Sequence, residues 1–356
     1  MRYESTATVA HLDDFDEIID VRSPAEFALD HAPGAKSYPV LGNEERARVG
    51  TLYVQVSPFD ARKLGAALVA RNIASHIESE FTSRPANWRP LVYCWRGGKR
   101  SGAMAHILRE IGWRASTLEG GYQSYRRAVV AELESLPRRF QYVVICGPTG
   151  SGKSHLLAAL EAQGGQVLDL EALARHRGSV LGALPAEPQP SQKMFDSLLW
   201  QRLRKFNPAQ PVFIEAESRR IGSVQLPSAL LESMRAGRCA RIEPAVAERV
   251  RFLIAEYRHL TIDPGLLKSQ LNLLSALQPR SVLAHWEQCI DAGAWAELVT
   301  DLLERHYDPL YRRSSARNYP HPEQAPVLRP AGLDAQTMAE SAAALMSQYE
   351  SDAVAI

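Results

Sequence analysis

The segment YVVICGPTGSGKS, from Tyr142 to Ser154, is the strongest indication of the fold of the second half of this 356-residue chain. The apolar run 142–146 predicts a buried strand, and the glycine-rich run after it has the spacing G-x-x-x-x-G-K-[ST] of a P-loop. In such a loop, backbone N–H groups turn toward phosphate oxygens, a lysine adds positive charge, and a serine at a helix N-terminus can ligate Mg²⁺. The sequence therefore predicts a diphosphate-binding loop of eight residues: Gly147, Pro148, Thr149, Gly150, Ser151, Gly152, Lys153 and Ser154.

Outward from this loop, strand-like and helix-like segments alternate. Apolar segments at 166–170, 212–217 and 239–243 predict further strands, and alternation with helices predicts a parallel sheet covered on both faces. From residue 245 onward the pattern is helical. We therefore expect a P-loop NTPase-like parallel α/β domain at 138–245 and a mainly helical C-terminal region at 246–356 that completes it.

The ligand of the P-loop is left open by the residues themselves. Glu215 and Glu217 end an apolar segment and are candidates for the acidic group near Mg²⁺, with a surface role as the alternative. No NTPase base or nucleobase-reading motif is evident. The loop could therefore serve a kinase, an ATPase or an enzyme that uses another diphosphate ester.

A second loop, CWRGGKRS, lies earlier in the chain between a predicted strand at 91–93 and a helix that starts near residue 101. A cysteine at such a turn has a lowered pKa, because the helix N-terminus favours the thiolate. Arg100 can fork onto a tetrahedral oxyanion, and glycines let the loop wrap around it. The predicted anion site therefore pairs Cys94 and Arg100 with Arg96, Gly97, Gly98, Lys99 and Ser101.

The cysteine loop is compatible with two kinds of enzyme, cysteine-based phosphatases and rhodanese domains. The spacing C-x5-R is that of the phosphatases. The ordered segments DVRSPAEF (20–27), HAPGA (31–35) and LEGGY (118–122) instead resemble rhodanese domains. The resemblance implies a rhodanese-like α/β domain at 1–137. Rhodanese loops usually have four residues between cysteine and arginine, whereas this loop has five. The wider loop suits a larger ligand than a sulfane sulfur, such as a phosphate-like anion.

Composition and charge set broad limits. A net charge of +1 neither establishes nor excludes an RNA partner. Four scattered cysteines without CxxC pairs or clustered histidines argue against a disulfide framework and a zinc site. No apolar run approaches the ~20 residues that span a bilayer, and the N-terminal segment lacks the apolar core of a signal peptide. A cytoplasmic location and no membrane partner are expected.

The order of the two loops in one chain resembles the tRNA 2-selenouridine synthases, also described as tRNA geranyltransferases. The segments NEERARVGTLY (43–53), DLEALARHRGS (169–179), IEAESRRIG (214–222) and HYDPLY (306–311) add to this resemblance. It implies a transferase that attaches a geranyl group from geranyl diphosphate to the sulfur of wobble 2-thiouridine in tRNA. The same enzyme would then replace the sulfur with selenium from selenophosphate.

The resemblance also implies roles for residues. Cys94 and Arg100 would act in the selenium step, with the remaining loop residues cradling selenophosphate, and the P-loop would hold geranyl diphosphate, with or without Mg²⁺. The helical region after residue 245 would contact tRNA. Diphosphate or tRNA phosphate would be contacted by Arg175, His176, Arg177, Arg219 and Arg220.

Two other functions fit parts of the sequence. One is an ATP-dependent tRNA sulfurtransferase or kinase fused to a rhodanese domain. The other is a phosphatase or redox regulator in which the P-loop senses nucleotide.

Overall fold

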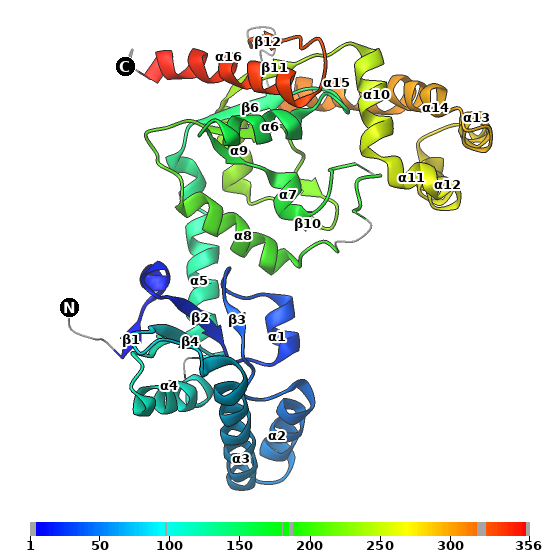
Figure 1. Cartoon of the computed structure of the whole chain (residues 1–356). Coiled ribbons are helices and arrows are strands. Elements are labelled where there is room, and N and C mark those ends of the chain that lie inside the picture. Colours follow the sequence, from blue (N-terminus) through cyan, green and yellow to red (C-terminus); the bar gives the residue numbers. More distant parts are fainter. Residues whose placement is uncertain (1–4, 97, 180, 185–187, 319–324, 354–356) are drawn as a thin grey trace. The chain divides into compact units, whose positions relative to one another are not determined.

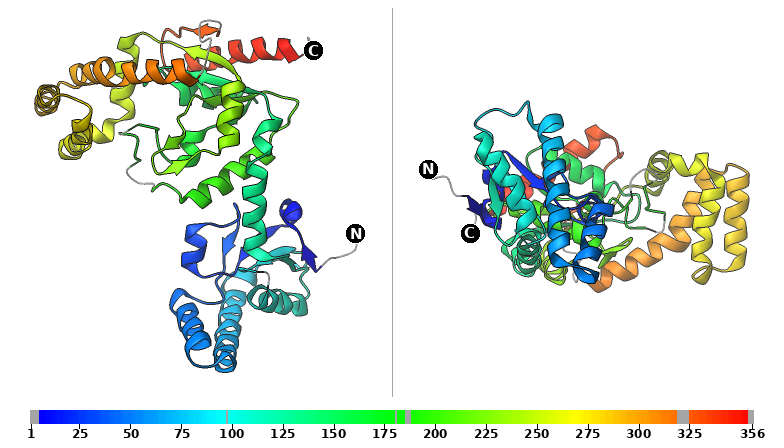
Figure 2. Two further views of the ribbon diagram at one scale, coloured as in Figure 1. Left: turned by 180° about the vertical axis from the view of Figure 1, so that it is seen from behind. Right: turned by 90° about the horizontal axis from the view of Figure 1, so that it is seen from below.

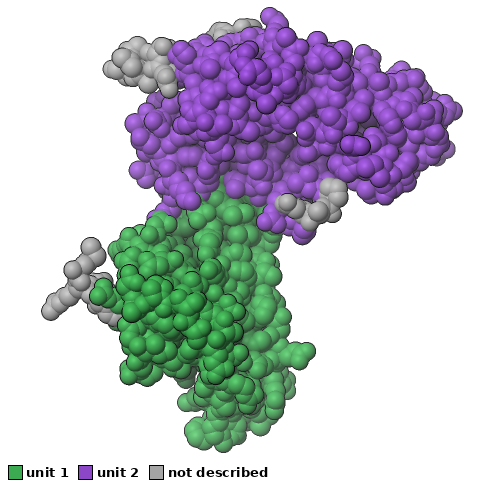
Figure 3. Space-filling model, viewed as in Figure 1, with its two compact units in different colours: residues 1–132, 190–201 green, residues 133–189, 202–356 purple. Residues whose placement is uncertain are grey.

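The computed structural model describes residues 5–96, 98–179, 181–184, 188–318 and 325–353 (Figure 1). The chain divides into two compact units, which are coloured separately in Figure 3. Unit 1 contains residues 1–132 and 190–201, and unit 2 contains residues 133–189 and 202–356. The domain limits expected at residues 137 and 245 stay predictions, because the division into units follows a different course along the chain.

Unit 1 is built on a five-stranded parallel sheet with the strand order β1-β5-β4-β2-β3. Its strands are β1 (Thr6–Ala7), β2 (Glu17–Asp20), β3 (Lys36–Ser37), β4 (Pro90–Tyr93) and β5 (Ser116–Leu118). Its helices are α1 (Pro24–Leu29), α2 (Asn43–Gln55), α3 (Pro58–His76), α4 (Lys99–Ile111) and α5 (Gly121–Leu133). A 3-10 segment at Val9–Asp14 and a π segment at Ile77–Phe81 complete this set.

Local sequence explains how the main elements of unit 1 form. Helix α1 begins with Pro24 at its first position and has a capping box, in which Ser23 and Glu26 satisfy each other's backbone N–H groups. Helix α4 buries Met104 and Leu108 in one core with Ile19 of β2. Burial of each such side chain contributes about 1.5–3 kcal/mol. This packing fixes the start of α4 at the end of β4.

Unit 2 has a second five-stranded parallel sheet, with the order β12-β11-β6-β8-β7. Its strands are β6 (Tyr142–Cys146), β7 (Gln166–Leu168), β8 (Val212–Glu215), β11 (Arg238–Ile242) and β12 (Val327–Leu328), and a separate antiparallel hairpin joins β9 (Arg220–Ile221) to β10 (Val224–Gln225). The central strand β6 leads directly into the P-loop.

Helices cover the sheet of unit 2. Helices α6 (Lys153–Ala162) and α16 (Ala335–Ala353) lie side by side and share a core with the sheet, in which Leu156 of α6 and Met338 of α16 are buried. The other helices are α7 (Leu170–Ala174), α9 (Ser228–Ala236), α10 (Val246–Glu256), α11 (Arg258–Ile262), α12 (Pro264–Asn272), α13 (Arg280–Asp291), α14 (Trp295–Leu302) and α15 (Asp308–Asn318). Short 3-10 or π segments lie at Leu136–Arg139, Leu273–Ala276 and Leu303–Tyr307. Helix α8 (Gln192–Arg204) begins in unit 1 and ends in unit 2.

The C-terminal helices form a second apolar core within unit 2. Helices α11 to α14 gather to one side of the sheet, as both views of Figure 2 show. Trp286 of α13 and Leu298 of α14 are buried in this core. Gly293, with φ of +65°, ends α13 and lets the chain turn back into α14.

The fold class expected from the sequence is confirmed: two parallel α/β arrangements are followed by a mainly helical region. The predicted strand at 142–146 has the same bounds in the structure. Strand β3 is short, Lys36–Ser37. Strand β12 was not expected, since Val327–Leu328 pairs at a sheet edge through contacts distant in sequence.

Candidate active sites

The thiol of Cys94 lies at the carboxyl end of β4 and is almost completely buried. Its Sγ accepts hydrogen bonds from the backbone N–H of Gly98 at 3.4 Å and from the Ser101 hydroxyl at 3.3 Å. Burial acts to raise the pKa of the Cys94 thiol, but these hydrogen bonds and the charge of Arg100 outweigh it and lower the pKa below its usual value. The loop is therefore built to hold a thiolate.

Replacing Ser101 with alanine is expected to move the titration of Cys94 to higher pH, because it removes a hydrogen bond that favours the thiolate. The thiolate is measured by its ultraviolet absorbance as a function of pH, as a difference from the Cys94→Ala protein. The matched control is Ser83→Ala, an exposed serine of unit 1. A midpoint that stays in place or falls in Ser101→Ala would contradict this role of the hydroxyl.

Arg100 faces a carboxylate rather than standing free. Its Nη1 lies 3.3 Å from Oε2 of Glu26, which also pairs with Nε of Arg46 at 2.9 Å. Burial acts to raise the pKa of Glu26, but the N–H of Ser23 and the two guanidinium groups lower it overall. Arg100 is thus held beside the thiolate loop, where its charge lowers the pKa of Cys94.

The remaining predicted residues of this loop differ in exposure. Gly98, Lys99 and Arg96 are exposed, whereas Ser101 is buried beneath the thiol. Gly97 lies outside the described residues.

A buried polar cluster is hydrogen-bonded to the backbone of the cysteine loop. Arg22 donates to both carboxylate oxygens of Asp20, and its guanidinium stacks 3.9 Å from the ring centre of Tyr122. Tyr122 in turn donates its hydroxyl proton to Asp30 at 2.7 Å and its backbone N–H to the carbonyl of Cys94 at 2.8 Å. The Asp30 carboxylate also accepts from the Ser197 hydroxyl at 2.8 Å. Sequence analysis missed this cluster, because nothing near Ser197 marks it as a partner of Asp30.

The P-loop of unit 2 surrounds its own lysine. Lys153 Nζ donates to the carbonyl of Gly147 at 2.9 Å and lies 3.4 Å from that of Pro148. Gly150 has φ of +76°, and a Cβ atom there would lie 2.7 Å from a methyl group of Leu253, so only glycine fits. The two carbonyl contacts hold the Lys153 ammonium group within the loop. A bound phosphate could replace these carbonyls as the acceptor of its hydrogen bonds. The other predicted loop residues line the same turn: Thr149, Ser151, Gly152 and Ser154.

A buried ion pair outside the motif fixes the shape of the P-loop. Arg249 of α10 is almost fully buried, and its Nε donates to the carbonyl of Thr149 at 2.9 Å. Its Nη1 and Nη2 atoms hold both carboxylate oxygens of Asp308 at 3.0 and 2.6 Å. Sequence analysis missed this pair, because the two residues lie far apart in the chain. The HYDPLY segment, which contains Asp308, was its only signal.

Several carboxylates converge near Lys153 and Ser154. Ser154 donates its hydroxyl proton to Glu171 at 3.2 Å, and a Cβ atom on Gly178 would lie 3.0 Å from Glu217 and 3.2 Å from Glu171. Burial and the charge of Glu171 raise the pKa of Glu217 to about 7. Burial likewise raises the pKa of Glu171 itself. Glu171 was not predicted as a site residue, and its only signal in the sequence was the DLEALARHRGS segment that contains it.

Glu215 has a structural contact that the sequence did not suggest. One carboxylate oxygen accepts from the backbone N–H groups of Leu170 and Glu171 at 2.7 and 2.9 Å, which holds the start of α7. Its other oxygen is buried and has no hydrogen-bond partner among the described residues. Burial and the neighbouring carboxylates raise the pKa of Glu215 well above its usual value.

The five predicted phosphate-contacting residues have different surroundings. Arg177 pairs with Glu256 at 3.0 Å and stacks on Tyr257, 4.8 Å from its ring centre. His176 accepts from the backbone N–H of Gly178, and burial lowers the pKa of His176, which favours the neutral ring. The other three are exposed: Arg175, Arg219 and Arg220.

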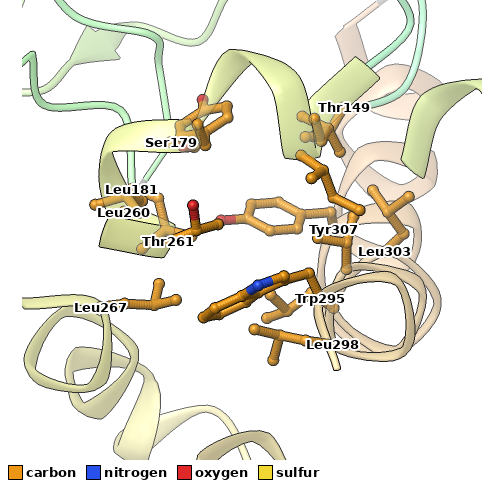
Figure 4. Close-up of a pocket in the computed structure, with 15 residues that line it drawn as sticks. Thr149, Ser179, Leu181, Leu260, Thr261, Leu267, Trp295, Leu298, Leu303 and Tyr307 are labelled. Atoms are coloured by element: carbon orange, nitrogen blue, oxygen red, sulfur yellow. The ribbon is translucent and has the colours of Figure 1, made fainter. Parts of the chain in front are cut away.

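An apolar pocket shares a wall with the P-loop (Figure 4). The hollow spans about 600 Å³ when the solvent at its open side is included, and its lining is almost entirely apolar. Thr149 of the P-loop lies at one edge, while Trp295 and Tyr307 project into the space. The other lining residues are Ser179, Leu181, Leu253, Ile254, Tyr257, Leu260, Thr261, Leu267, Leu298, Val299, Leu302 and Leu303. A ligand with an anionic head and an apolar tail would fit both surfaces.

Among the described residues, each helix is too short or too polar to cross a membrane.

The fold and the two loops define a class of protein in which a rhodanese-like domain precedes a P-loop domain. A family model described as rhodanese-like domain matches residues 6–128, and one described as tRNA 2-selenouridine synthase AAA domain matches residues 140–266.

Three relatives, each called tRNA 2-selenouridine synthase, extend this match. The protein of Bdellovibrio bacteriovorus is 34% identical over 349 residues, which cover 85% of this chain and 89% of that protein. The protein of Alcanivorax borkumensis is 31% identical over 325 residues, covering 83% and 88%. The protein of Nitrosomonas europaea is 37% identical over 244 residues, covering 67% and 63%. This chain belongs to the tRNA 2-selenouridine synthase family. The match spans less than two thirds of the Nitrosomonas europaea relative.

Proposed function

We propose that this protein is a transferase that converts wobble 2-thiouridine of tRNA into 2-selenouridine through an S-geranyl intermediate. The observation that carries the proposal is the shared wall of the P-loop and the apolar pocket at Thr149. Geranyl diphosphate has the matching shape, since an anionic diphosphate is joined to a branched hydrocarbon chain. A nucleotide would place a polar ribose and base where the lining is apolar.

In the first reaction, the P-loop holds the diphosphate and the pocket holds the geranyl chain. The sulfur of 2-thiouridine forms a bond to C1 of the geranyl group, and the C1–O bond to diphosphate breaks. Diphosphate leaves with the electron pair, and the N3 proton of the base passes to water. Lys153 and the loop N–H groups stabilise the negative charge that develops on the leaving diphosphate.

The carboxylate side of the P-loop fits a Mg²⁺ ion. The Ser154 hydroxyl and the carboxylates of Glu171 and Glu217 are the hard oxygen ligands that Mg²⁺ prefers. The unpartnered buried oxygen of Glu215 is a further oxygen in the same group of carboxyl side chains. When bound, Mg²⁺ would offset charge on the diphosphate oxygens.

In the second reaction, selenium from selenophosphate adds to C2 of the base and the geranyl thiolate leaves, while water takes up the phosphoryl group as the Se–P bond breaks. The Cys94 loop is the proposed selenophosphate site, with Arg96, Lys99 and Arg100 supplying positive charge. Alkylation makes sulfur a better leaving group, which is why geranylation precedes the exchange.

We further propose tRNA as the partner and the cytoplasm as the location, since tRNA is the substrate. The exposed residues Arg175, Arg219 and Arg220 suit contacts with phosphate groups. The helical region at 246–356 is proposed to add further contacts with tRNA. The rhodanese-like domain is proposed to end near residue 137 and the α/β part of the P-loop domain near residue 245.

Filling the pocket tests the assignment of the geranyl site. Val299→Trp is expected to weaken geranyl diphosphate binding at least about tenfold, because excluding two CH₂ groups already costs about 1.6 kcal/mol. Binding of inorganic diphosphate should be unchanged, since the P-loop is untouched. Both affinities are measured by calorimetry or by ligand-induced thermal stabilisation.

Val246→Trp is the matched control, because this exposed residue of α10 lies outside the pocket lining. The pocket assignment would be contradicted if Val299→Trp weakened the binding of geranyl diphosphate and of inorganic diphosphate equally, or weakened neither. A wild-type protein that is stabilised by ATP and indifferent to geranyl diphosphate would overturn the proposal in favour of an ATP-dependent sulfurtransferase or kinase.

A further inference from the structure

We propose that His285, Cys289 and Glu297 form a binding site for a zinc-like divalent ion that joins α13 to α14. Each residue offers one ligand atom, and the three atoms lie within 4.8 Å of one another. The cluster is separate from the P-loop and the cysteine loop, and the proposal does not rest on the proposed transferase activity. A thiolate, an imidazole and a carboxylate together are a ligand set typical of zinc.

The spacing of the ligand atoms fits tetrahedral coordination. Nε2 of His285 lies 3.7 Å from Sγ of Cys289 and 3.7 Å from Oε1 of Glu297. Zinc bonds of about 2.0–2.3 Å at tetrahedral angles separate neighbouring ligand atoms by about 3.5 Å. Both distances are close to that value, and the thiol and carboxylate lie within 4.8 Å of each other, so an ion could enter with small side-chain rotations that draw these two groups together.

The same geometry argues against a proton relay. In a Cys-His-Glu catalytic triad, one ring nitrogen faces the thiol and the other faces the carboxylate. Here Nε2 of His285 faces both groups. A single ring nitrogen cannot pass a proton between them, whereas three donor atoms aimed at one point are the arrangement that a metal ion requires.

Local structure explains why the three residues meet. His285 and Cys289 are four residues apart on α13 and therefore lie on one face of the helix. The tight turn at Gly293, in which the N–H of Ala294 donates to the carbonyl of Cys289 at 2.8 Å, brings Glu297 in the first turn of α14 back toward them. Sequence analysis predicted no zinc site, because this ligand set contains one cysteine and its third member comes from the next helix.

The surroundings supply the remaining requirements of an ion site. Cys289 is buried, whereas Glu297 is exposed, so the cluster has one closed side and one open side. The open side is a hollow lined by Thr300, Asp301 and Glu304 in addition to His285 and Glu297. Asp301 already pairs with Arg305 at 2.5 Å, so Glu297 and Glu304 are the acidic groups that favour a cation there, and the hollow leaves room for water as the fourth ligand.

The proposed ion would stabilise a wall of the apolar pocket. Trp295, Leu298 and Val299 of α14 line that pocket, and Glu297 lies between them in sequence. An ion that ties Glu297 to α13 therefore restrains the helix that carries these side chains. Its proposed role is structural.

The test is metal titration of the full chain after treatment with a chelator and dialysis. Co²⁺ serves as the probe, because tetrahedral coordination and a thiolate bond each give a distinct absorption band. One equivalent of Co²⁺ should produce both bands, and Zn²⁺ should abolish them. Zn²⁺ should also raise the thermal midpoint of the wild-type protein.

Variants assign the bands to the cluster. Cys289→Ser should remove the thiolate band and the Zn²⁺-dependent thermal shift. Glu297→Gln, which changes an exposed side chain and should fold normally, is expected to weaken Co²⁺ binding at least about tenfold. The matched control is His106→Gln, since His106 and Glu110 form an exposed i,i+4 pair without a cysteine, and its binding should equal that of the wild type.

The titration is performed in a Cys94→Ser background, so that the other activated thiol cannot bind the probe. Absence of the thiolate band, or its survival in Cys289→Ser, would overturn the proposal. Co²⁺ affinity that is unchanged in Glu297→Gln would also overturn it.

Discussion

Lys153→Ala is expected to reduce geranyl transfer to 2-thiouridine by about 10²–10³-fold, the cost of removing one donor that stabilises developing negative charge. The wild-type ammonium lies within hydrogen-bond reach of the Gly147 carbonyl, inside the loop that would hold the diphosphate. Alanine leaves the backbone N–H groups in place but removes the positive charge. The product is measured by mass spectrometry of a tRNA anticodon stem-loop incubated with geranyl diphosphate.

Two controls sharpen this experiment. Lys205→Ala, at an exposed lysine of unit 2, should geranylate as the wild type does. Lys153→Ala should still add selenium to RNA that already carries the S-geranyl group. Wild-type geranylation by Lys153→Ala would refute the role of the P-loop.

Cys94→Ser is expected to affect the other reaction from Lys153→Ala. Selenium incorporation should fall at least about 10²-fold, and geranylation should be retained. The structure gives Cys94 the environment of a thiolate, with donors from Ser101 and Gly98, and a serine hydroxyl cannot be ionised in their place at neutral pH. Selenium on the wobble base is followed by mass spectrometry with selenophosphate and S-geranylated RNA as substrates.

Cys239→Ser is the matched thiol control, because Cys239 lies on β11 of unit 2, away from the cysteine loop in the chain. The protein must remain folded, as judged by circular dichroism. If a folded Cys94→Ser protein lost both activities, the proposed division of labour between the two loops would be wrong.

The parts of the molecule that could be predicted from sequence are those formed by contiguous residues. The P-loop follows its strand directly, so backbone geometry and chemistry are specified within the thirteen residues from Tyr142 to Ser154. The cysteine loop is also formed by contiguous residues, since the Ser101 hydroxyl donates to the thiol of Cys94 seven residues earlier in the chain. In such segments, local propensity and the position of glycine determine where each functional group lies.

The parts that could not be predicted depend on contacts between distant segments. Arg249 and Asp308 meet beneath Thr149 only after the helical region has packed against the P-loop. Glu171 becomes a neighbour of Ser154 only because β7 and β8 place α7 at the same edge of the sheet. The apolar pocket could not be predicted for the same reason, because its lining comes from several helices. Each of these helices has the sequence pattern of an ordinary core helix.

Helix α8 begins with residues that belong to unit 1, although residues 133–189 of unit 2 precede it in the chain. Ser197 and Asp196 of α8 bond to Asp30 and Arg126 of unit 1, although residues 133–189 separate the two parts in the chain. A ribosome must therefore translate the P-loop before the rhodanese-like unit can acquire its last buried partners. A gene split after residue 132 would remove the Ser197 and Asp196 partners of Asp30 and Arg126 from that unit. The two halves are thus constrained to be inherited as a single reading frame.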